Sequence, residues 1–516
     1  MNAIAITPRL ALVIERPLWA DDCFWRRLRV MSLSNLGRSR FVPPYPPRPR
    51  VAPSIWRRLS LARENFLAMW EDSAFDLEFS EGNLLARKVF VCNSPRSVQF
   101  AFSQSNASFE RKSPQMRHAL RPLLGDGLFI SDGETWRQRR KIVAPIVHVS
   151  RLGRFASLMV EAAVETRDRW ARLDGQRIDV LAECAQLTAE VICRTVFGRE
   201  LGHRHAQEFI GGFSDYQAAV GQVDLMSLLG LPDWMPRWQS RTVRRSIRRI
   251  HGALDAVVAG HRAGTERDGA SVLGGLLNAR DENGIPLDAM AIRNEAAVLF
   301  MAGHETTANA LAWAWYLISQ APEVEAKLHA EIDAVIGART ARLEDVAKLV
   351  YTQAIVDEAM RLYPPVPILS RECVVEERYD DTVIPKGSLV LVVPWLLHRH
   401  RKLWTAPDAF IPERFLEGSG EPVSKFAYVP FSIGPRICAG MAFGHVEAVL
   451  CLATLAQAFR LELAEGHEVR PVARLTLRPE GGLPMVVRGR GRAPSGRQVA
   501  PDSAPVTALR CPLGHG

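Results

Sequence analysis

The sequence predicts one large domain that is mainly α-helical with small β-sheets, an α+β fold. Apolar residues recur with helical spacing from about Ile55 to Leu463, within a chain of 516 residues that can bury a large core. One stretch, Leu287 to Pro322, is apolar on nearly every side over about 33 residues, which is roughly 50 Å of helix. Such a helix must cross the middle of the molecule. Strand-like runs are few and short.

The chain begins with an irregular region over residues 1–50, which ends in "RFVPPYPPRPR" (Arg40–Arg50). Proline fixes φ and restricts the residue before it, so we expect a stiff, extended lead-in. Residues 51–488 form the expected domain. Residues 489–516 are rich in Arg, Gly, Pro and Ser with few large apolar groups, and we expect them to be disordered.

Two segments within the domain have the pattern of strands. "KVFVCNSP" (Lys88–Pro95) alternates in polarity and ends in a turn. "DTVIPKGSLVLVVPWLL" (Asp381–Leu397) resembles two short strands around a Pro-Lys-Gly turn. The expected sheets are therefore small beside the helices.

The chain is basic, with a net charge of +9 and a pI of about 9.3. This indicates either a solvated basic surface or an acidic partner such as a small electron-transfer protein. Nucleic acid is disfavoured, because no recognition motif and no basic helix with interleaved aromatic residues is present. "RTVRRSIRRI" (Arg241–Ile250) places its arginines opposite Val243, Ile247 and Ile250. It is either a solvated helix face or a peripheral contact with an anionic membrane.

The first segment of the chain has an apolar run of only a few residues, broken by Arg9 and Glu15. It is too short and too charged for a signal peptide or a membrane span. We expect the other apolar stretches also to fall short of a bilayer. The sequence therefore predicts a soluble, cytoplasmic protein without a transmembrane anchor.

The cysteines are scattered and form no CxxC pair, which argues against zinc ribbons, c-type haem attachment and a disulfide framework. A reducing compartment fits this pattern. Cys511 and His515 could bind a metal in the tail, but an exposed thiol is the simpler interpretation. The eight cysteines are Cys23, Cys92, Cys184, Cys193, Cys373, Cys438, Cys451 and Cys511.

The long apolar helix contains a polar group at its centre, Gly303, His304, Glu305, Thr306 and Thr307. A buried glutamate is rare unless it is paired or functional. A threonine can bond to a carbonyl four residues earlier and merely bend the helix. Glycine next to Glu-Thr-Thr in a core helix favours a functional site.

One cysteine lies in an unusual setting, "PFSIGPRICAGMAFG" (Pro430–Gly444). Gly434 can adopt the geometry of a tight turn, and Gly440 lets another group approach the backbone closely. Helical spacing begins at Met441, so Cys438 lies at a helix N-terminus, where amides and the dipole favour a thiolate. This thiolate could bind a metal, or it could be a nucleophile with a nearby His or Asn as base.

Charged residues at helical spacing form three further motifs. Glu358 and Arg361 in "DEAMRLYPPVP" share a helix face, although an exposed pair of this kind contributes well under about 1 kcal/mol. "FIPERF" offers Arg414 as a second guanidinium. Trp136 and Arg140 in "DGETWRQRRKI" are one helical turn apart, with an exposed basic helix as the alternative interpretation.

Taken together, these stretches resemble the cytochrome P450 family, the haem-thiolate monooxygenases. The order and spacing of the motifs match over roughly Arg40 to Val487. The matching residues are Phe431, Gly434, Arg436, Cys438 and Gly440 in the cysteine loop, Ala302–Thr307 in the oxygen-activation motif, Glu358 and Arg361 of the ExxR pair, Arg414 as the third member of its triad, Trp136 and Arg140 of the WxxxR element, and Arg371 in "PVPILSRE".

The resemblance implies the P450 fold and a heme b cofactor whose iron is bound by the thiolate of Cys438. Arg436, Arg371, Arg140 and Trp136 would hold the haem propionates. The remaining roles concern oxygen: the region of Gly303 would leave room for O₂, while Thr306 and Glu305 would supply protons.

The resemblance also implies a monooxygenase that hydroxylates or epoxidises a lipophilic substrate. The chain ends soon after the hairpin Arg474–Val487, so electrons are expected from NAD(P)H through a separate ferredoxin or flavodoxin with its reductase. The apolar segment Asp224–Trp238 is expected near the substrate. The other expected pocket residues are Val298, Phe300, Ala302, Val366, Ile368 and Leu369.

Three alternative functions are weighed against this one. A peroxygenase using H₂O₂ and a haem-thiolate sensor without turnover are both disfavoured by the acid and alcohol pair Glu305 and Thr306. A hydrolase with a cysteine nucleophile predicts a colourless protein. Two positions depart from the family pattern: His400 replaces the more common aspartate and is expected to affect a local turn, and His148 replaces a common phenylalanine and puts local packing in doubt.

Overall fold

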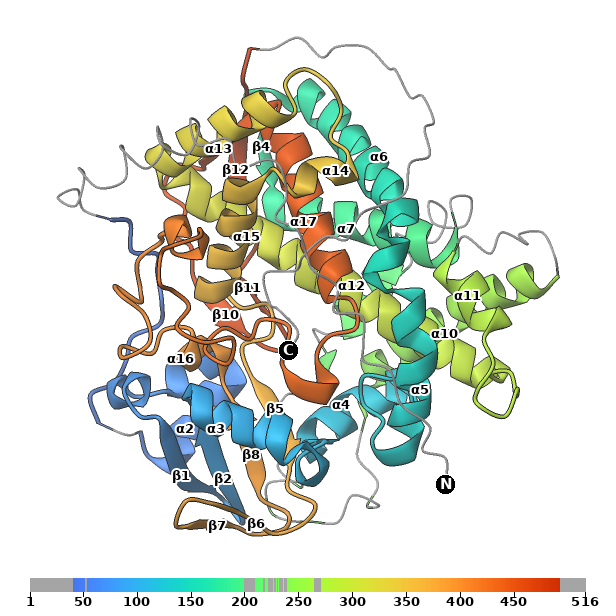
Figure 1. The fold of residues 1–516 in the computed structure, drawn as a ribbon, viewed down its shortest axis with the longest axis vertical. Helices are drawn as coiled ribbons and strands as arrows, with labels where there is room; N and C mark the ends of the chain where they lie inside the picture. The colour runs from blue at the N-terminus through green and yellow to red at the C-terminus, as the bar shows by residue number, and fades with distance from the viewer. Residues whose placement is uncertain are drawn as a thin grey trace, which may run out of the picture. The chain divides into compact units, whose positions relative to one another are not determined.

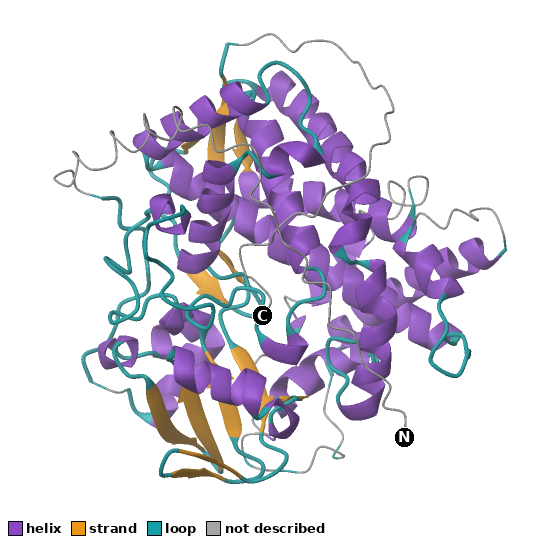
Figure 2. Cartoon of the chain, in the orientation of Figure 1, coloured by secondary structure: helices purple, strands orange, loops and turns teal. Residues whose placement is uncertain are grey.

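The structure is a computed structural model that describes residues 40–51, 53–198, 209–216, 219–220, 239–263 and 271–491, with residues 226, 229, 231 and 235. The expected lead-in before residue 40, the expected tail from residue 492 and most of the segment 224–238 lie outside the described residues. The described part is largely helical with small sheets (Figures 1 and 2), which confirms the predicted α+β class.

The helices account for most of the regular structure. In chain order they are α2 (Ile55–Glu64), α3 (Pro95–Gln99), α4 (Pro114–Leu124), α5 (Gly133–Ile146), α6 (Leu152–Trp170), α7 (Val180–Phe197), α10 (Arg241–Arg262), α11 (Val272–Asn278), α12 (Ala289–Ser319), α13 (Pro322–Val335), α14 (Leu343–Val346), α15 (Val350–Leu362), α16 (Pro394–Leu397) and α17 (Met441–Ala456).

The predicted long helix is α12, with 31 residues. It begins after Asp288, whose carboxylate accepts a hydrogen bond from the backbone N–H of Ala291 at 2.7 Å. It ends at Ser319, near Ala321, because the residue before Pro322 is disfavoured in the helical conformation. α12 packs on α7, α10, α15 and α17, so it is buried along most of its length (Figure 1). This placement explains why the sequence is apolar nearly all round.

The largest sheet has the strand order β1-β2-β8-β5-β3, with β2 and β8 parallel and the other pairs antiparallel. The remaining strands form a three-stranded sheet and two hairpins. In chain order the strands are β1 (Phe79–Leu84), β2 (Arg87–Cys92), β3 (Arg111–Lys112), β4 (Arg177–Asp179), β5 (Leu369–Glu372), β6 (Glu377–Tyr379), β7 (Thr382–Ile384), β8 (Leu389–Val392), β9 (Phe459–Leu463), β10 (Pro471–Ala473), β11 (Leu477–Pro479) and β12 (Pro484–Gly489).

Both strand predictions correspond to strands. The first is β2, and the second contains β7 and β8 on either side of the turn at Gly387, which has φ of +84°. The last residues of the second segment differ from the expectation, because Pro394 begins the short helix α16. Proline has no N–H to donate to a sheet and has the φ that a first helical turn requires.

The proline-rich residues 41–50 contain no helix or strand but are attached to the core of the domain. The hydroxyl of Tyr363 donates to the carbonyl of Pro44 at 2.8 Å. Arg48 forms an ion pair with Asp408 and lies 3.9 Å from the ring centre of Phe75. A proline-rich segment has few backbone donors of its own, so side chains from the core and from Arg48 hold it in place.

One helical run in the described part, Gly133–Leu173, is long and apolar enough to cross a membrane by length and composition. The prediction that every apolar stretch falls short of a bilayer is wrong for this run. It consists of α5, a short 3-10 turn and α6. Phe155, Met159 and Ala163 of α6 are buried, and α6 packs on α7 and α17. The apolar residues of this run therefore belong to the core of the domain.

Candidate active site

A cavity of about 290 Å³ lies between α12 and the loop that carries Cys438. Thr306 of α12 lines it, as do Cys438 and the side chains of Trp136 and Arg140 from α5. Most other groups around it are apolar, including Leu120, Val143, Met360 and Leu475. Residues from the long helix, the cysteine loop and the WxxxR element, which are far apart in the sequence, thus meet at one site.

The cysteine loop is held in its conformation by backbone contacts. Gly434 has φ of +74°, and a side chain there would overlap the carbonyl oxygen of Phe102, so glycine is required. Ser432 also has a positive φ, +63°, which is strained for a residue with a side chain. The backbone N–H of Cys438 donates to the carbonyl of Phe431 at 2.9 Å. These contacts present the thiol of Cys438 to the cavity.

Opposing influences act on the pKa of the Cys438 thiol. Burial away from bulk solvent raises the pKa of the thiol, and this effect outweighs the opposing effects of the Gly440 amide, Arg140 and Lys112. Gly440 itself lines the cavity and has open space where a side chain would begin. A thiolate at this position therefore needs a cation close to the sulfur in addition to the helix.

Basic side chains are concentrated around one part of the cavity. Arg436 donates to the carbonyls of Glu110 and Ser131, both at 2.5 Å, and lies 4.8 Å from the ring centre of Trp136. Arg140 and Lys112 also line the cavity. Burial and the neighbouring charges of Arg371 and Arg436 hold the pKa of Lys112 well below its usual value. Sequence reasoning missed Lys112, which no motif marks.

Arg371 lies behind this group and does not line the cavity wall. It is directly opposite Lys112 in the pairing of β3 with β5. Burial lowers its pKa to about 9, and its Nη1 has no hydrogen-bond partner in the described part of the protein. Like charges directly opposite in a sheet are destabilising, so this arrangement calls for an anion.

Thr306 and Glu305 line the cavity from α12. The Thr306 hydroxyl donates to the carbonyl of Ala302 at 2.6 Å, so its oxygen can still accept a hydrogen bond from the cavity. A carboxylate oxygen of Glu305 accepts from the hydroxyl of Thr476 at 2.8 Å, next to β11. Thr306 therefore combines the two roles considered from the sequence: its hydroxyl bonds back to a carbonyl of the helix, and its oxygen also faces the site.

Gly303 has a packing role in addition to the one expected at the cavity. A side chain at Gly303 would overlap Ile192 of α7, so glycine permits the close packing of α7 on α12. Gly303 also lines the cavity, but its neighbour Ile192 explains the residue type. The nearby carbonyl of His304 accepts a hydrogen bond from Thr188 of α7 at 2.7 Å.

Glu447 is a second residue that sequence reasoning missed. It is fully buried on α17, lines the cavity and lies beside the hydroxyl of Thr307. Burial raises the pKa of its carboxyl well above the usual value, which favours the neutral form. A glutamate in the apolar sequence of α17 was the available signal.

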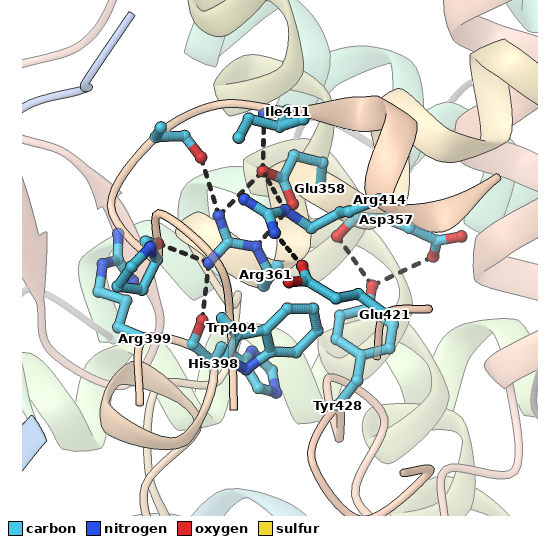
Figure 3. Close-up of polar contacts among 12 residues, drawn as sticks. Asp357, Glu358, Arg361, His398, Arg399, Trp404, Ile411, Arg414, Glu421 and Tyr428 are labelled. Carbon is cyan, nitrogen blue, oxygen red and sulfur yellow. Dashed lines mark hydrogen bonds and ion pairs between the residues drawn. The ribbon is translucent and has the colours of Figure 1, made fainter. Parts of the chain in front are cut away.

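The side chains of Glu358 and Arg361 are fully buried, and Figure 3 shows their contacts. The energy of well under about 1 kcal/mol, which holds for an exposed pair, therefore does not apply to them. Arg361 donates to both oxygens of the Glu358 carboxylate, from Nε at 2.6 Å and from Nη2 at 2.9 Å. Its other donors bond to the carbonyls of His398, Pro407 and Ala409. Arg414 donates to Glu358 at 3.1 Å. The cluster joins α15 to the segment before the cysteine loop, because Arg361 bonds to three carbonyls of that segment and Arg414 bonds to Glu358.

A neighbouring buried cluster links α15 to α17. The hydroxyl of Tyr428 donates to Asp357, and His445 of α17 lies 3.3 Å from the same carboxylate. His398 accepts a hydrogen bond from the backbone N–H of Val429 at 2.9 Å. These contacts fix the segment that leads into the cysteine loop.

The two departures from the family pattern have local consequences. His400 is buried, and its Nδ1 accepts from the N–H of Lys402 at 3.2 Å, which stabilises a turn. His148 is exposed and caps a short 3-10 helix by accepting from the N–H of Ser150. Neither residue lines the cavity.

Four of the six expected pocket residues line the cavity: Val298, Ala302, Val366 and Leu369. Phe300 does not, because two residues along a helix turn the side chain by about 200°. It is buried against Phe213 and His304, with ring centres 5.0 and 4.7 Å away. Ile368 lines a second cavity of about 420 Å³, because neighbouring residues of an extended segment face opposite sides. The two cavities share Met116, Ser370 and Leu475.

A family model described as Cytochrome P450 matches residues 46–484. The chain belongs to the cytochrome P450 family. It is 32% identical to cyclooctatin synthase of Streptomyces melanosporofaciens over 397 residues, 76% of this chain and 84% of that protein. It is 30% identical to human cytochrome P450 4V2 over 393 residues, 70% of this chain and 74% of that protein.

The fold leads to the same family. The crystal structure of a mutant cytochrome P450DA haem domain matches with a TM-score of 0.68 and 26% identity, covering 80% of this chain and 90% of that one. This confirms the predicted P450 fold. The chain is accordingly a haem monooxygenase, with a cysteine thiolate as iron ligand, and it requires O₂, a substrate and redox partners.

The residues around the cavity fit this cofactor. Haem carries two carboxylates, and the basic cluster of Lys112, Arg140, Arg371 and Arg436 is where an anion is needed. The thiol that faces the cavity is of the ligand type that the family uses. The fit therefore rests on charge, on an unpartnered buried donor and on the donor atom.

Proposed function

We propose that Cys438 is the thiolate ligand of the haem iron in this P450 and that Thr306 and Glu305 supply protons for O₂ activation. The enzyme then inserts one oxygen atom into a lipophilic substrate. The observation that carries the proposal is that Cys438 and Thr306 line one cavity from different elements, with basic groups beside it. Haem with a thiolate ligand supplies the activation and cleavage of the O–O bond.

The residues of the chain then have separable tasks. Arg436, Arg140 and Lys112 bind the carboxylates of the cofactor, with Arg371 behind them and Trp136 beneath Arg436. Thr306 holds its hydroxyl oxygen toward the cavity while its hydrogen is bonded to Ala302. Glu305 provides a carboxyl one residue away, oriented by Thr476. This pair places a carboxyl and a hydroxyl oxygen beside the site, where they can hold and move protons.

A lipophilic substrate is supported by the predominantly apolar lining of both cavities. Val298, Ala302, Val366 and Leu369 contribute to the first cavity. Val89, Val91, Leu389 and Leu391 from β2 and β8 contribute to the second. The names of two relatives, cyclooctatin synthase and cytokinin hydroxylase, indicate different substrates. The proposal therefore names only the class of substrate, a lipophilic molecule.

Electrons are proposed to come from a separate ferredoxin or flavodoxin with an NAD(P)H reductase, in the cytoplasm. An acidic partner of this kind suits the net charge of +9. α5 presents Arg137 and Lys141 to solvent while Arg140 of the same helix faces the cavity. A donor bound over α5 would therefore be close to the cofactor.

The test begins with the spectrum of reduced protein with and without carbon monoxide. The parent should show the strongly red-shifted Soret band of thiolate-bound haem, and Cys438→His should lose it while retaining haem. A parent band at the position of histidine-bound haem, or a variant band unchanged from the parent, would show that Cys438 is not the ligand. Substrate-dependent NADPH consumption with a surrogate ferredoxin and reductase, reduced by Thr306→Ala, then separates a monooxygenase from a sensor.

A further inference from the structure

The N-terminal half of α10 has a strongly basic exposed face. Arg241, Arg244, Arg245, Arg248 and Arg249 are all exposed. At 100° per residue they cover an arc of about 140°. The opposite side of the same turns is buried, at Val243, Ser246 and Ile250, so the helix is fixed to the domain by its apolar side. We call these five residues the α10 arginine face.

This charge is not explained by contacts within the protein. The helix has no acidic residue from Arg241 to Leu254, and Asp255 pairs with Arg293 at 3.2 Å. Within the described ranges, none of the ion pairs involves an arginine of this face. Three of them also lie in the first turns of the helix, where the macrodipole is positive and basic residues are unfavourable. The arrangement costs helix stability, which suggests that it is retained for binding.

A phospholipid surface suits the face better than an acidic electron donor. α10 packs mainly on α12 and α4, whereas the electron donor is proposed to bind over α5, so the α10 arginine face is separate from the proposed donor site. Guanidinium groups bind phosphate through paired hydrogen bonds. Leu229, in the sequence leading into α10, has 52% of its surface exposed.

We infer that the α10 arginine face docks this P450 on an anionic phospholipid bilayer. Each arginine near such a surface should strengthen binding about fivefold. The contact is peripheral and electrostatic, so it weakens as salt screens the charges. It goes beyond the proposed monooxygenase reaction and does not depend on the identity of the substrate.

The test uses the full-length, haem-loaded protein and sedimentation with vesicles of phosphatidylcholine alone or with phosphatidylglycerol added. We expect binding to the anionic vesicles only, and a roughly 100-fold loss in the triple variant Arg244→Gln, Arg245→Gln and Arg248→Gln. A matched triple variant, Arg172→Gln, Arg177→Gln and Lys386→Gln, removes the same charge from exposed residues on other elements and should bind like the parent. Unchanged carbon monoxide spectra establish that both variants are folded.

Three results would overturn the inference. Equal binding to neutral and anionic vesicles would remove the role of charge. Equal losses in the two triple variants would indicate net charge rather than this face. Absence of vesicle binding, together with loss of ferredoxin-dependent reduction only in the α10 variant, would assign the face to an acidic protein.

Discussion

Lys112 and Arg371 illustrate how two residues can be placed against their own electrostatic preference. They are direct neighbours across β3 and β5, both carry positive charge, and burial lowers the pKa of each. An isolated pair of this kind is destabilising, and an anion between or beside the two groups reverses the sign. At the proposed haem site, binding of the propionates would offset this cost.

We predict that Lys112→Gln increases the rate of haem loss roughly tenfold. A change of this size corresponds to the loss of about one charge-assisted hydrogen bond to the cofactor. The rate is measured by transfer of haem to an excess of apomyoglobin, followed by absorbance. Arg111→Gln is the matched control, since Arg111 is the preceding residue of β3 and pairs with Asp132 at 3.0 Å. Similar rates for parent and Lys112→Gln would mean that Lys112 does not contact the cofactor.

At Glu358 the prediction concerns stability. Glu358→Gln keeps the shape of the side chain but leaves Arg361 buried without a counter-charge and removes one of the two carboxylates that pair with Arg414. Breaking a buried ion pair in this way costs about 3–5 kcal/mol. The decrease should appear as a lower urea midpoint of the haem-loaded protein. Arg470→Ala, which breaks an exposed pair with Glu468, should not move the midpoint measurably. A small effect at Glu358 would mean that water reaches the cluster.

At the scale of elements, the packing of α7 on α12 depends on Gly303. Alanine is the better helix former by about 1 kcal/mol, but its methyl group would overlap Ile192. Overpacking typically costs about 1–3 kcal/mol, so we predict that Gly303→Ala lowers stability. Gly252→Ala, on α10 with open space around it, should instead raise stability. Both are measured by urea unfolding.

A double-mutant cycle identifies the contact responsible. Ile192→Ala alone should be destabilising, because it removes buried methyl groups from α7. In the Gly303→Ala background the same change relieves the overlap, so the two substitutions should be less harmful together than their sum. Additive effects would indicate that Gly303 acts through something other than Ile192.

Sequence patterns predicted the helices and strands of this site more reliably than the contacts between them. The length of α12 and the helical spacing of Glu358 and Arg361 are local properties that the sequence displays directly. Phe300 was misplaced because both sides of α12 are apolar, so periodicity cannot distinguish the cavity side from the core side. Lys112 and Glu447 were missed because their importance arises from burial and from the partners that β3 and α17 bring close.

Over the whole molecule, buried titratable groups act on stability in opposite directions. Burial lowers the pKa of His329 to about 4, below the usual 6.5, so the unfolded chain binds more protons and stability falls as the pH drops below about 6.5. His251, His304, His398 and His400 shift in the same direction. Burial raises the pKa of Glu295 to about 7, so its contribution is present below about 4.5 and is lost as the pH rises toward 7.

These opposing contributions predict variants whose relative stability changes with pH in opposite senses. Compared with the parent, Glu295→Gln should gain stability as the pH rises from 4.5 to 7.5, by at most about 3 kcal/mol, since one pKa unit corresponds to about 1.4 kcal/mol. His329→Gln should gain relative stability as the pH falls from 7 to 4, by less, because its ring is partly exposed. Urea midpoints of the haem-loaded proteins across this range measure both. Parallel pH profiles for the two variants would mean that Glu295 and His329 each have the same pKa in the folded chain as in the unfolded chain. The loss of stability in acid would then be due to other carboxylates, such as Asp126 and Glu413. Hydrogen bonds and nearby basic groups lower the pKa values of these two carboxylates despite partial burial.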